Sequence, residues 1–261
     1  MWGGTGVAIR AAEIEVYVYI DRNCQQFTEM AIVVNPSHTL RPLGLGEQIA
    51  HRLRVDIISG AIPDGTHLAE DNLAARFDVS RGPVRDALRQ LESEGLVDNR
   101  RKRLYAQFLG LPDIEELYSL RENLEAMAIR LAIDHAGAKD WDGVQRLVDA
   151  MGVAAETEDY ESFDAADMEF HTSFYLLSGH RRLADAWRPY QRTFEVLLEM
   201  SNTPDMSAAV VDHQEFLDIV RSGDPDAAVR RLHNHLTKAK GHIRDVMKSR
   251  GDNVSPDQVA I

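Results

Sequence analysis

The chain has 261 residues, of which 44% are hydrophobic and 27% charged, and this length suits two compact domains. Its 29 Lys and Arg residues against 42 Asp and Glu residues give a formal net charge of −13, which argues against a partner as anionic as DNA or a lipid surface. The single cysteine, Cys24, excludes an internal disulfide framework and favours a reducing compartment. No apolar run approaches the roughly 18 to 20 residues that span a bilayer, and the N-terminus lacks the basic-then-apolar pattern of a secretory signal. Composition therefore predicts a globular, cytoplasmic protein that does not associate with membranes.

The first 42 residues differ from the rest of the chain. Ile14, Val16, Val18 and Ile20 alternate at period 2, which predicts a short strand without an obvious partner. We expect residues 1–42 to form a poorly ordered N-terminal extension.

Residues 43–109 have the pattern of a winged helix-turn-helix domain. Apolar spacing predicts three helices, at 46–58, about 70–77 and about 81–94. Ser80 is the expected N-cap of the third helix, and Gly95 is expected to end it. Two short strands, at 96–97 and 104–108, are expected to flank a basic turn at Arg100, Arg101, Lys102 and Arg103.

The negative charge is not distributed evenly. Residues 43–111 contain 10 basic and 10 acidic side chains, whereas residues 112–261 contain 16 basic and 28 acidic ones. In the third helix, Arg81, Arg85 and Arg89 recur every four residues along the face opposite the apolar stripe. That face is where a recognition helix meets the major groove, and the basic turn is placed to contact phosphates or the minor groove. Counted by segment, the charge therefore favours DNA binding, although a charged helix face is also common on any protein surface.

Residues 112–249 show only helical periods and predict an all-α bundle of six helices. The expected helices are 112–137, 140–155, 158–177, 180–202, 206–222 and 224–249, and residues 250–261 are expected to be a flexible tail. The fold class predicted for the whole chain is mainly α, with an N-terminal winged helix-turn-helix followed by this bundle.

Four polar residues lie on apolar, inward-facing stripes of the bundle. Asp167 and His171 are spaced i, i+4 on one helix, and His213 and His235 each share a face with apolar residues of later helices. A buried carboxylate is costly unless it is paired, protonated or bound to a cation. One Asp and three His from three helices suit a divalent transition metal such as Zn, Ni, Mn or Fe, and the pattern does not select among these metals. A single inward His is more often an ordinary core residue, and His242, one heptad after His235, competes for the fourth position.

The stretch LAEDNLAARFDVSRGPVRDALRQLESEGLV, residues 68–97, closely resembles the winged-helix domain of GntR-type transcription regulators. The resemblance covers about residues 45–108 and implies that Ser80, Arg81, Gly82 and Arg85 approach DNA. The wing of that family usually turns on Gly, whereas this chain has Asn99 followed by four basic residues. That departure suggests a stronger and less specific contact with the DNA backbone.

Residues 112–245 resemble the FCD ligand-binding domain of the FadR subfamily, and the count of six helices is similar to its VanR-like branch. The resemblance implies a metal site at Asp167, His171, His213 and His235, and a small organic acid whose carboxylate completes the coordination. Arg121 matches a pocket arginine of the family and is the expected effector-binding residue, since a guanidinium pairs with a carboxylate as a fork. Its alternative role is an ordinary i, i+4 ion pair with Glu125.

The favoured function is that of a ligand-responsive transcription regulator, either a repressor or an activator, and not an enzyme. As a homodimer it would bind a pseudo-palindromic operator in double-stranded DNA, and a small acid would change its affinity for that operator. Two alternatives remain: a metal-dependent hydrolytic enzyme built on the bundle, and a constitutive DNA-binding protein whose bundle is only structural. Turnover of an acid would favour the enzyme. Operator binding that acids and chelators leave unchanged would favour the constitutive DNA-binding protein.

Overall fold

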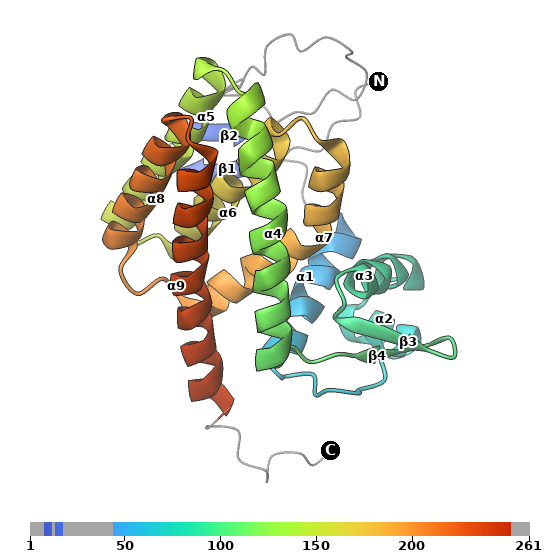
Figure 1. Cartoon of the computed structure of the whole chain (residues 1–261). Coiled ribbons are helices and arrows are strands. Elements are labelled where there is room, and N and C mark those ends of the chain that lie inside the picture. Colours follow the sequence, from blue (N-terminus) through green and yellow to red (C-terminus); the bar gives the residue numbers. More distant parts are fainter. Residues whose placement is uncertain (1–7, 12–13, 18–43, 252–261) are drawn as a thin grey trace. The chain divides into compact units, whose positions relative to one another are not determined.

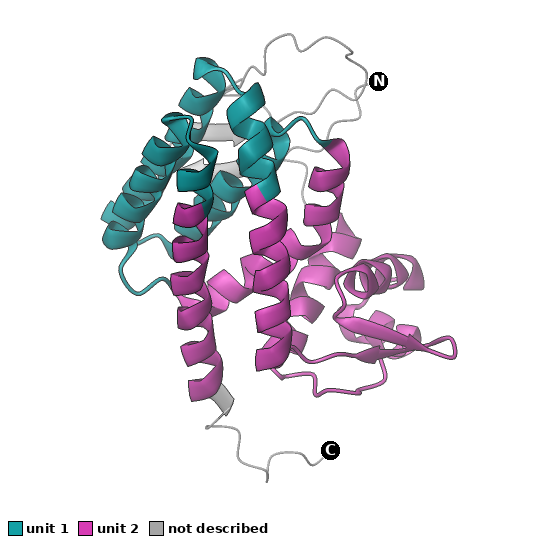
Figure 2. Cartoon of the chain, in the orientation of Figure 1, with its two compact units in different colours: residues 1–42, 127–180, 203–229 teal, residues 43–126, 181–202, 230–261 magenta. Residues whose placement is uncertain are grey.

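The computed structural model describes residues 8–11, 14–17 and 44–251, and the described chain is mainly α-helical (Figure 1). It divides into two compact units, one made of residues 1–42, 127–180 and 203–229 and the other of residues 43–126, 181–202 and 230–261 (Figure 2). Two long helices, α4 and α9, contribute residues to both units. Among the described residues, no helix is both long enough and apolar enough to cross a membrane.

The second unit contains the predicted winged helix-turn-helix. Its elements are α1 (Leu45–Ile58), α2 (Glu70–Phe77), α3 (Arg81–Ser93), β3 (Val97–Arg100) and β4 (Arg103–Ala106). Apolar residues of α1 and α3 form its core: Leu53, Ile57, Val84, Leu88 and Leu91 are fully buried. The turn between α2 and α3 depends on Asp78, which has a left-handed backbone with φ of 53° and ends α2. Gly95, with φ of 79°, ends α3 as the sequence predicts.

The wing is an antiparallel pair of strands, and the turn that joins them is shorter than the four-residue basic turn that the sequence predicts. Arg100 faces Arg103 across the ladder, so the connection is only two residues long. Both residues of this turn, Arg101 and Lys102, have positive φ angles of 51° and 66°. Two left-handed residues are what a two-residue hairpin turn of type I′ requires, although Asn-Gly usually occupies these positions. The wing therefore turns without glycine, and its two strands extend up to the basic residues that the sequence had placed in a longer turn.

A buried ion pair fixes α1 against the end of α3. The Nε and Nη2 atoms of Arg54 donate to the two carboxylate oxygens of Glu94, each at 2.6 Å, and both side chains are only 1% exposed. Burial raises the pKa of the Glu94 carboxyl even though Arg54 opposes the shift. The attraction between the two charges thus only partly offsets the cost of removing the carboxylate from water.

Six helices follow the wing, as the sequence predicts. They are α4 (Leu111–His135), α5 (Ala138–Glu156), α6 (Tyr160–Leu177), α7 (Arg181–Ser201), α8 (Met206–Arg221) and α9 (Pro225–Gly251). Within the second unit, α4 and α9 run antiparallel, because Glu115 pairs with Lys240 while Glu122 pairs with His233.

The first unit is built around α5, α6 and α8. Asp159 and Asp205 cap the N-termini of α6 and α8 by accepting hydrogen bonds from backbone N–H groups. The unit also includes an antiparallel pair of strands, β1 (Ala8–Ala11) and β2 (Ile14–Tyr17). The expected strand is thus present, and its partner is the segment directly before it, which the sequence analysis did not identify. The remainder of the predicted N-terminal extension and residues 252–261 of the predicted tail lie outside the described residues.

Breaking the buried pair should destabilise the winged helix-turn-helix. We expect Glu94→Gln to lower the free energy of unfolding by about 3–5 kcal/mol, because it leaves the guanidinium of Arg54 buried without its counter-charge. Urea unfolding followed by circular dichroism measures the loss. The double variant Arg54→Met, Glu94→Leu should recover most of the stability, and a double variant less stable than Glu94→Gln would contradict this account.

Candidate DNA interface and metal centre

The exposed face of α3 carries the predicted DNA-contacting residues. Ser80 is at the N-cap position, and its side chain makes no capping hydrogen bond to the helix. Arg81, Arg85 and Arg89 are exposed, whereas Val84 and Leu88 on the opposite face are buried. The structure therefore presents the arginine stripe to solvent, in the arrangement that a recognition helix needs.

Two of these arginines are paired with the first turn of α2. Arg85 donates from Nε and Nη2 to the two carboxylate oxygens of Glu70, at 3.2 and 2.9 Å. Nε of Arg81 lies 2.5 Å from Oδ1 of Asp71, while Arg89 is 3.8 Å from Asp86 of its own helix. Helical spacing within α3 gives no sign of the α2 partners, so the sequence analysis missed Glu70 and Asp71.

The wing adds a second basic surface. Its four basic residues are exposed, and the guanidinium of Arg100 lies 5.5 Å from the ring centre of Tyr105 while its Nε donates to Asp98 at 2.6 Å. The ring of His67 packs on Tyr105, with the centres 5.3 Å apart. These contacts hold the strands at the base of the wing in place, and so they fix the position of the basic turn at its tip.

The first unit holds a buried group of residues of the types that bind metals. Asp167 and His171 lie one turn apart on α6, and His213 lies on α8; these three residues are 8%, 1% and 3% exposed. One carboxylate oxygen of Asp167 is 2.7 Å from Nε2 of His213 and 3.5 Å from Nε2 of His171. Two imidazoles thus converge on the same oxygen.

The hydrogen bonds of His213 indicate that the pair of His213 and Asp167 favours a proton or a cation between them. Its Nδ1 lies 2.8 Å from the carbonyl oxygen of Ala209, which only accepts, so Nδ1 carries the proton. A neutral His213 then presents a bare Nε2 to a carboxylate, and two acceptors at 2.7 Å repel unless a proton or a cation lies between them. A backbone carbonyl that accepts from the other ring nitrogen and so fixes the ring is characteristic of histidines that bind metals.

Three residues of the first unit together offer donors for one ion. Asp167, His171 and His213 each have one ligand atom, and these three atoms lie within 4.8 Å of one another. The predicted fourth ligand, His235, belongs to the second unit. Ligands at about 2.0–2.2 Å from a metal are at most about 4.4 Å apart, so the described side chains match such an ion after small movements. The competing residue, His242, instead lies 3.2 Å from the carbonyl oxygen of Ser201.

Aromatic side chains surround the cluster within the first unit. The ring of Phe170 packs edge-on against His171 and His213, and Phe216 lies beside His171. Burial in these surroundings raises the pKa of Asp167, but His213 and His171 outweigh this and hold the pKa well below its usual range. Asp167 is therefore an ionised, buried carboxylate, the form that coordinates a metal.

Arg121 is buried in the second unit, and its surroundings are partly aromatic. Its Nε donates to Glu125 at 3.1 Å, so the i, i+4 ion pair that is its alternative role is present. The guanidinium also lies 4.8 Å from the ring centre of Phe194 and 5.5 Å from that of Trp187, both on α7. The guanidinium is thus held both by an acid of its own helix and by two aromatic rings of α7.

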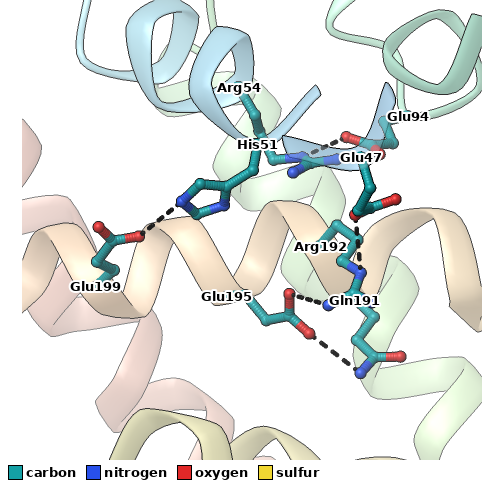
Figure 3. Close-up of polar contacts among 8 residues, drawn as sticks. All are labelled: Glu47, His51, Arg54, Glu94, Gln191, Arg192, Glu195 and Glu199. Carbon is teal, nitrogen blue, oxygen red and sulfur yellow. Dashed lines mark hydrogen bonds and ion pairs between the residues drawn. The ribbon is translucent and has the colours of Figure 1, made fainter. Parts of the chain in front are cut away.

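Helix α7 also contacts α1 of the winged helix-turn-helix (Figure 3). Arg192 lies 3.5 Å from Glu47 of α1 and 2.8 Å from Glu195 of its own helix. Nε2 of His51 on α1 is 3.8 Å from the Glu199 carboxylate of α7. Within the second unit, one helix therefore touches both Arg121 and the first helix of the winged domain.

Comparison with known proteins agrees with this architecture. Residues 45–103 match the family described as bacterial regulatory proteins, gntR family, and residues 116–238 match the FCD domain. The chain belongs to the GntR family and carries an FCD domain. It is 28% identical over 228 residues to the gluconate operon transcriptional repressor of Bacillus subtilis, covering 82% of this chain and 91% of that protein.

Further relatives extend the comparison. The HTH-type transcriptional repressor RspR of Escherichia coli is 24% identical over 213 residues, covering 80% of this chain and 92% of that protein. Among solved structures, E. coli McbR/YncC shares the fold, with a TM-score of 0.61 at 21% identity over 78% of this chain and 98% of that one. The GntR-family chain is thus a ligand-responsive, DNA-binding transcription regulator, and its curated relatives are named as regulators and not as enzymes.

Proposed function

We propose that this GntR-family regulator represses transcription and is controlled by a small organic acid that binds at a metal ion in the FCD domain. The observation that carries the proposal is the buried Asp167 oxygen, on which Nε2 of His171 and Nε2 of His213 converge. Such a donor set holds a divalent metal while leaving coordination positions open, and a carboxylate is a suitable ligand for an open position. The regulator would act in the cytoplasm, with residues 43–109 as reader and 112–249 as sensor.

DNA reading is assigned to α3 and the wing. The proposed contacts are Ser80, Arg81, Gly82, Arg85, Arg89, Arg100, Arg101, Lys102 and Arg103. Arginines of α3 would pair with guanine edges in the major groove, while the wing residues would contact phosphates. Because the wing turn places four basic side chains close together, it is expected to contribute affinity through phosphate contacts more than specificity.

A homodimer is the proposed working form. Two copies are needed to place two recognition helices on a pseudo-palindromic operator one helical turn apart. Leu120 and Met127 lie seven residues apart on α4 and are 37% and 45% exposed. Apolar side chains at that spacing share one face of a helix, which is the pattern that an interface with a second helix uses.

The metal ligands are proposed to be Asp167, His171, His213 and His235. His235 is preferred to His242 because His242 already contacts the carbonyl oxygen of Ser201. The donor set of three imidazoles and one carboxylate suits Zn, Ni, Mn or Fe. Arg121 is proposed as the residue that pairs with the carboxylate of the effector.

The recognition face can be tested with Arg85→Ala. We expect it to weaken binding to an operator selected from random duplexes by about 1–3 kcal/mol, the range for losing one bidentate base contact. Fluorescence anisotropy measures the affinity, and an unchanged far-ultraviolet circular dichroism spectrum shows that the fold is intact. Arg130→Ala, which removes an equal charge from α4, serves as the control and should bind as the wild type. Equal affinities of the wild type and Arg85→Ala would refute the assigned face.

The metal site can be tested by elemental analysis. Asp167→Ala combined with His213→Ala should abolish bound metal. His235→Ala should weaken metal affinity by more than about 100-fold, since loss of a group that only hydrogen-bonds to a ligand already costs about 10–100-fold. His242→Ala is the matched control and should keep full stoichiometry. Metal that persists in the double variant would rule out the site. Loss of metal in His242→Ala alone would show that His242, and not His235, is the fourth ligand.

The effector can be sought by thermal shift with a panel of small carboxylates that includes gluconate. A matching acid at 100 times its Kd should stabilise the metal-loaded protein by about 2.7 kcal/mol. That corresponds to a rise in Tm of about 5–10 °C. The rise should vanish after chelation and should be largely lost in Arg121→Lys, which keeps the charge but not the fork. An equal rise in the chelated protein would show that acids bind away from the metal, and turnover of an acid would reveal an enzyme.

A further inference from the structure

The pairing of Arg85 with Glu70 concerns the proposed reading arginine directly. Glu70 lies in the first turn of α2, and Arg85 lies in the second turn of α3. Both hydrogen bonds use one edge of the guanidinium, Nε and Nη2, and each reaches a different carboxylate oxygen, at 3.2 and 2.9 Å. A guanidinium has five N–H donors, so the outer edge formed by Nη1 and Nη2 keeps three of them.

That outer edge is the one that suits a guanine. Bidentate pairing with O6 and N7 of guanine needs two N–H groups that point the same way, and the two terminal nitrogens of a guanidinium provide them. A carboxylate on the inner edge leaves this pairing possible and prevents the side chain from swinging to a nearby phosphate. We propose that Glu70 is a positioning residue for DNA recognition, which holds Arg85 for base reading and thereby sets sequence specificity. The proposal depends on the DNA-reading role assigned above to Arg85.

Three observations separate Glu70 from an incidental surface partner. Its side chain is only 32% exposed, whereas Asp71, which contacts Arg81 through one oxygen, is 65% exposed. Its carboxylate lies at the N-terminus of α2, where the helix dipole favours negative charge. The hydrogen bonds with Arg85 lower the pKa of Glu70, and Arg81 and Arg89 lower it further, so the Glu70 carboxylate is ionised at neutral pH.

A carboxylate at this position also disfavours binding to the wrong DNA. It adds a negative charge beside the arginine stripe, so a duplex that offers only phosphates gains less from Arg85. A duplex with guanine at the right position still gains the bidentate contact. Glu70 therefore widens the difference between operator and random DNA, which is how specificity arises.

The test compares Glu70→Gln with Asp86→Asn in the full-length protein. Both variants remove one negative charge near α3, but Asp86 lies 3.8 Å from Arg89 and has no hydrogen bond to Arg85. The probes are an operator selected in vitro by the wild-type protein and a scrambled duplex of equal length and composition. Affinities for both are measured by anisotropy over a range of salt concentrations.

We expect Glu70→Gln to bind the scrambled duplex several-fold more tightly and to lower the ratio of operator to scrambled affinity at least fivefold. The salt dependence on scrambled DNA should steepen by about one released ion, because the freed Arg85 reaches a phosphate. Asp86→Asn should shift both affinities together and keep the ratio within twofold of the wild type. Glu70→Ala, checked for an unchanged unfolding midpoint, should repeat the effect of Glu70→Gln.

Two results would overturn the proposal. If the ratio in Glu70→Gln stays within twofold of the wild type, or falls only as far as in Asp86→Asn, Glu70 has no positioning role. If Arg85→Ala keeps full operator affinity, the assigned face itself is wrong and the role of Glu70 fails with it. The first result leaves the proposed DNA-binding face intact, so the two failures are distinguishable.

Discussion

The buried Arg54–Glu94 pair is the interaction on which the DNA-binding domain depends. It joins the middle of α1 to the residue that follows α3, and neither side chain reaches solvent. Since a buried ion pair gives little net stability over apolar packing, its value lies in geometry, because only one register of α1 against α3 satisfies both hydrogen bonds. The register fixes the direction in which the arginines of α3 point, so the exposed reading face follows from a charge pair inside the core.

Charge burial recurs in the helices that follow and has a different consequence in each case. Arg121 and Glu125 compensate each other within α4, and the guanidinium gains a second stabilisation from the rings of α7. The partners of Asp167 in the described part of the chain are imidazoles, and a histidine compensates a carboxylate fully only when it is protonated or shares a metal with it. Glu125 supplies Arg121 with a counter-charge inside the protein, whereas Asp167 gains most from a cation. This difference is the physical reason to propose the metal at Asp167.

The sequence predicted much of this architecture because the deciding signals are local. Apolar periods placed the helices to within about two residues, and Gly95 ended α3 as expected. The inward-facing Asp167, His171 and His213 were found from the same periods. The left-handed turn at Arg101 and Lys102 was not predicted, since those residue types carry no preference for that conformation.

Contacts between elements were harder to predict, and physical signals for them were few. Arg54 lies four residues before Ile58 on a face that is otherwise apolar, which in retrospect indicates a buried charge in need of a partner. Glu70 and Asp71 gave no such signal, because acidic residues in a first helical turn already have a local role. Only the packing of α2 on α3 brings them to the arginines.

Within the second unit, helix α7 links Arg121 to the first helix of the winged domain. One of its faces places Trp187 and Phe194 against Arg121, and another places Arg192 and Glu199 against α1. The first contacts are aromatic and buried, whereas the second are ionic and half-exposed, so the second set is the weaker and rearranges first. If an acid draws Arg121 away from the rings, α7 must repack against α4, and the ionic contacts with α1 are the ones that can change at little cost. Because α1 is tied to α3 by Arg54 and Glu94, a change at α7 would reach the recognition helix as a shift of the whole domain and not as a local distortion.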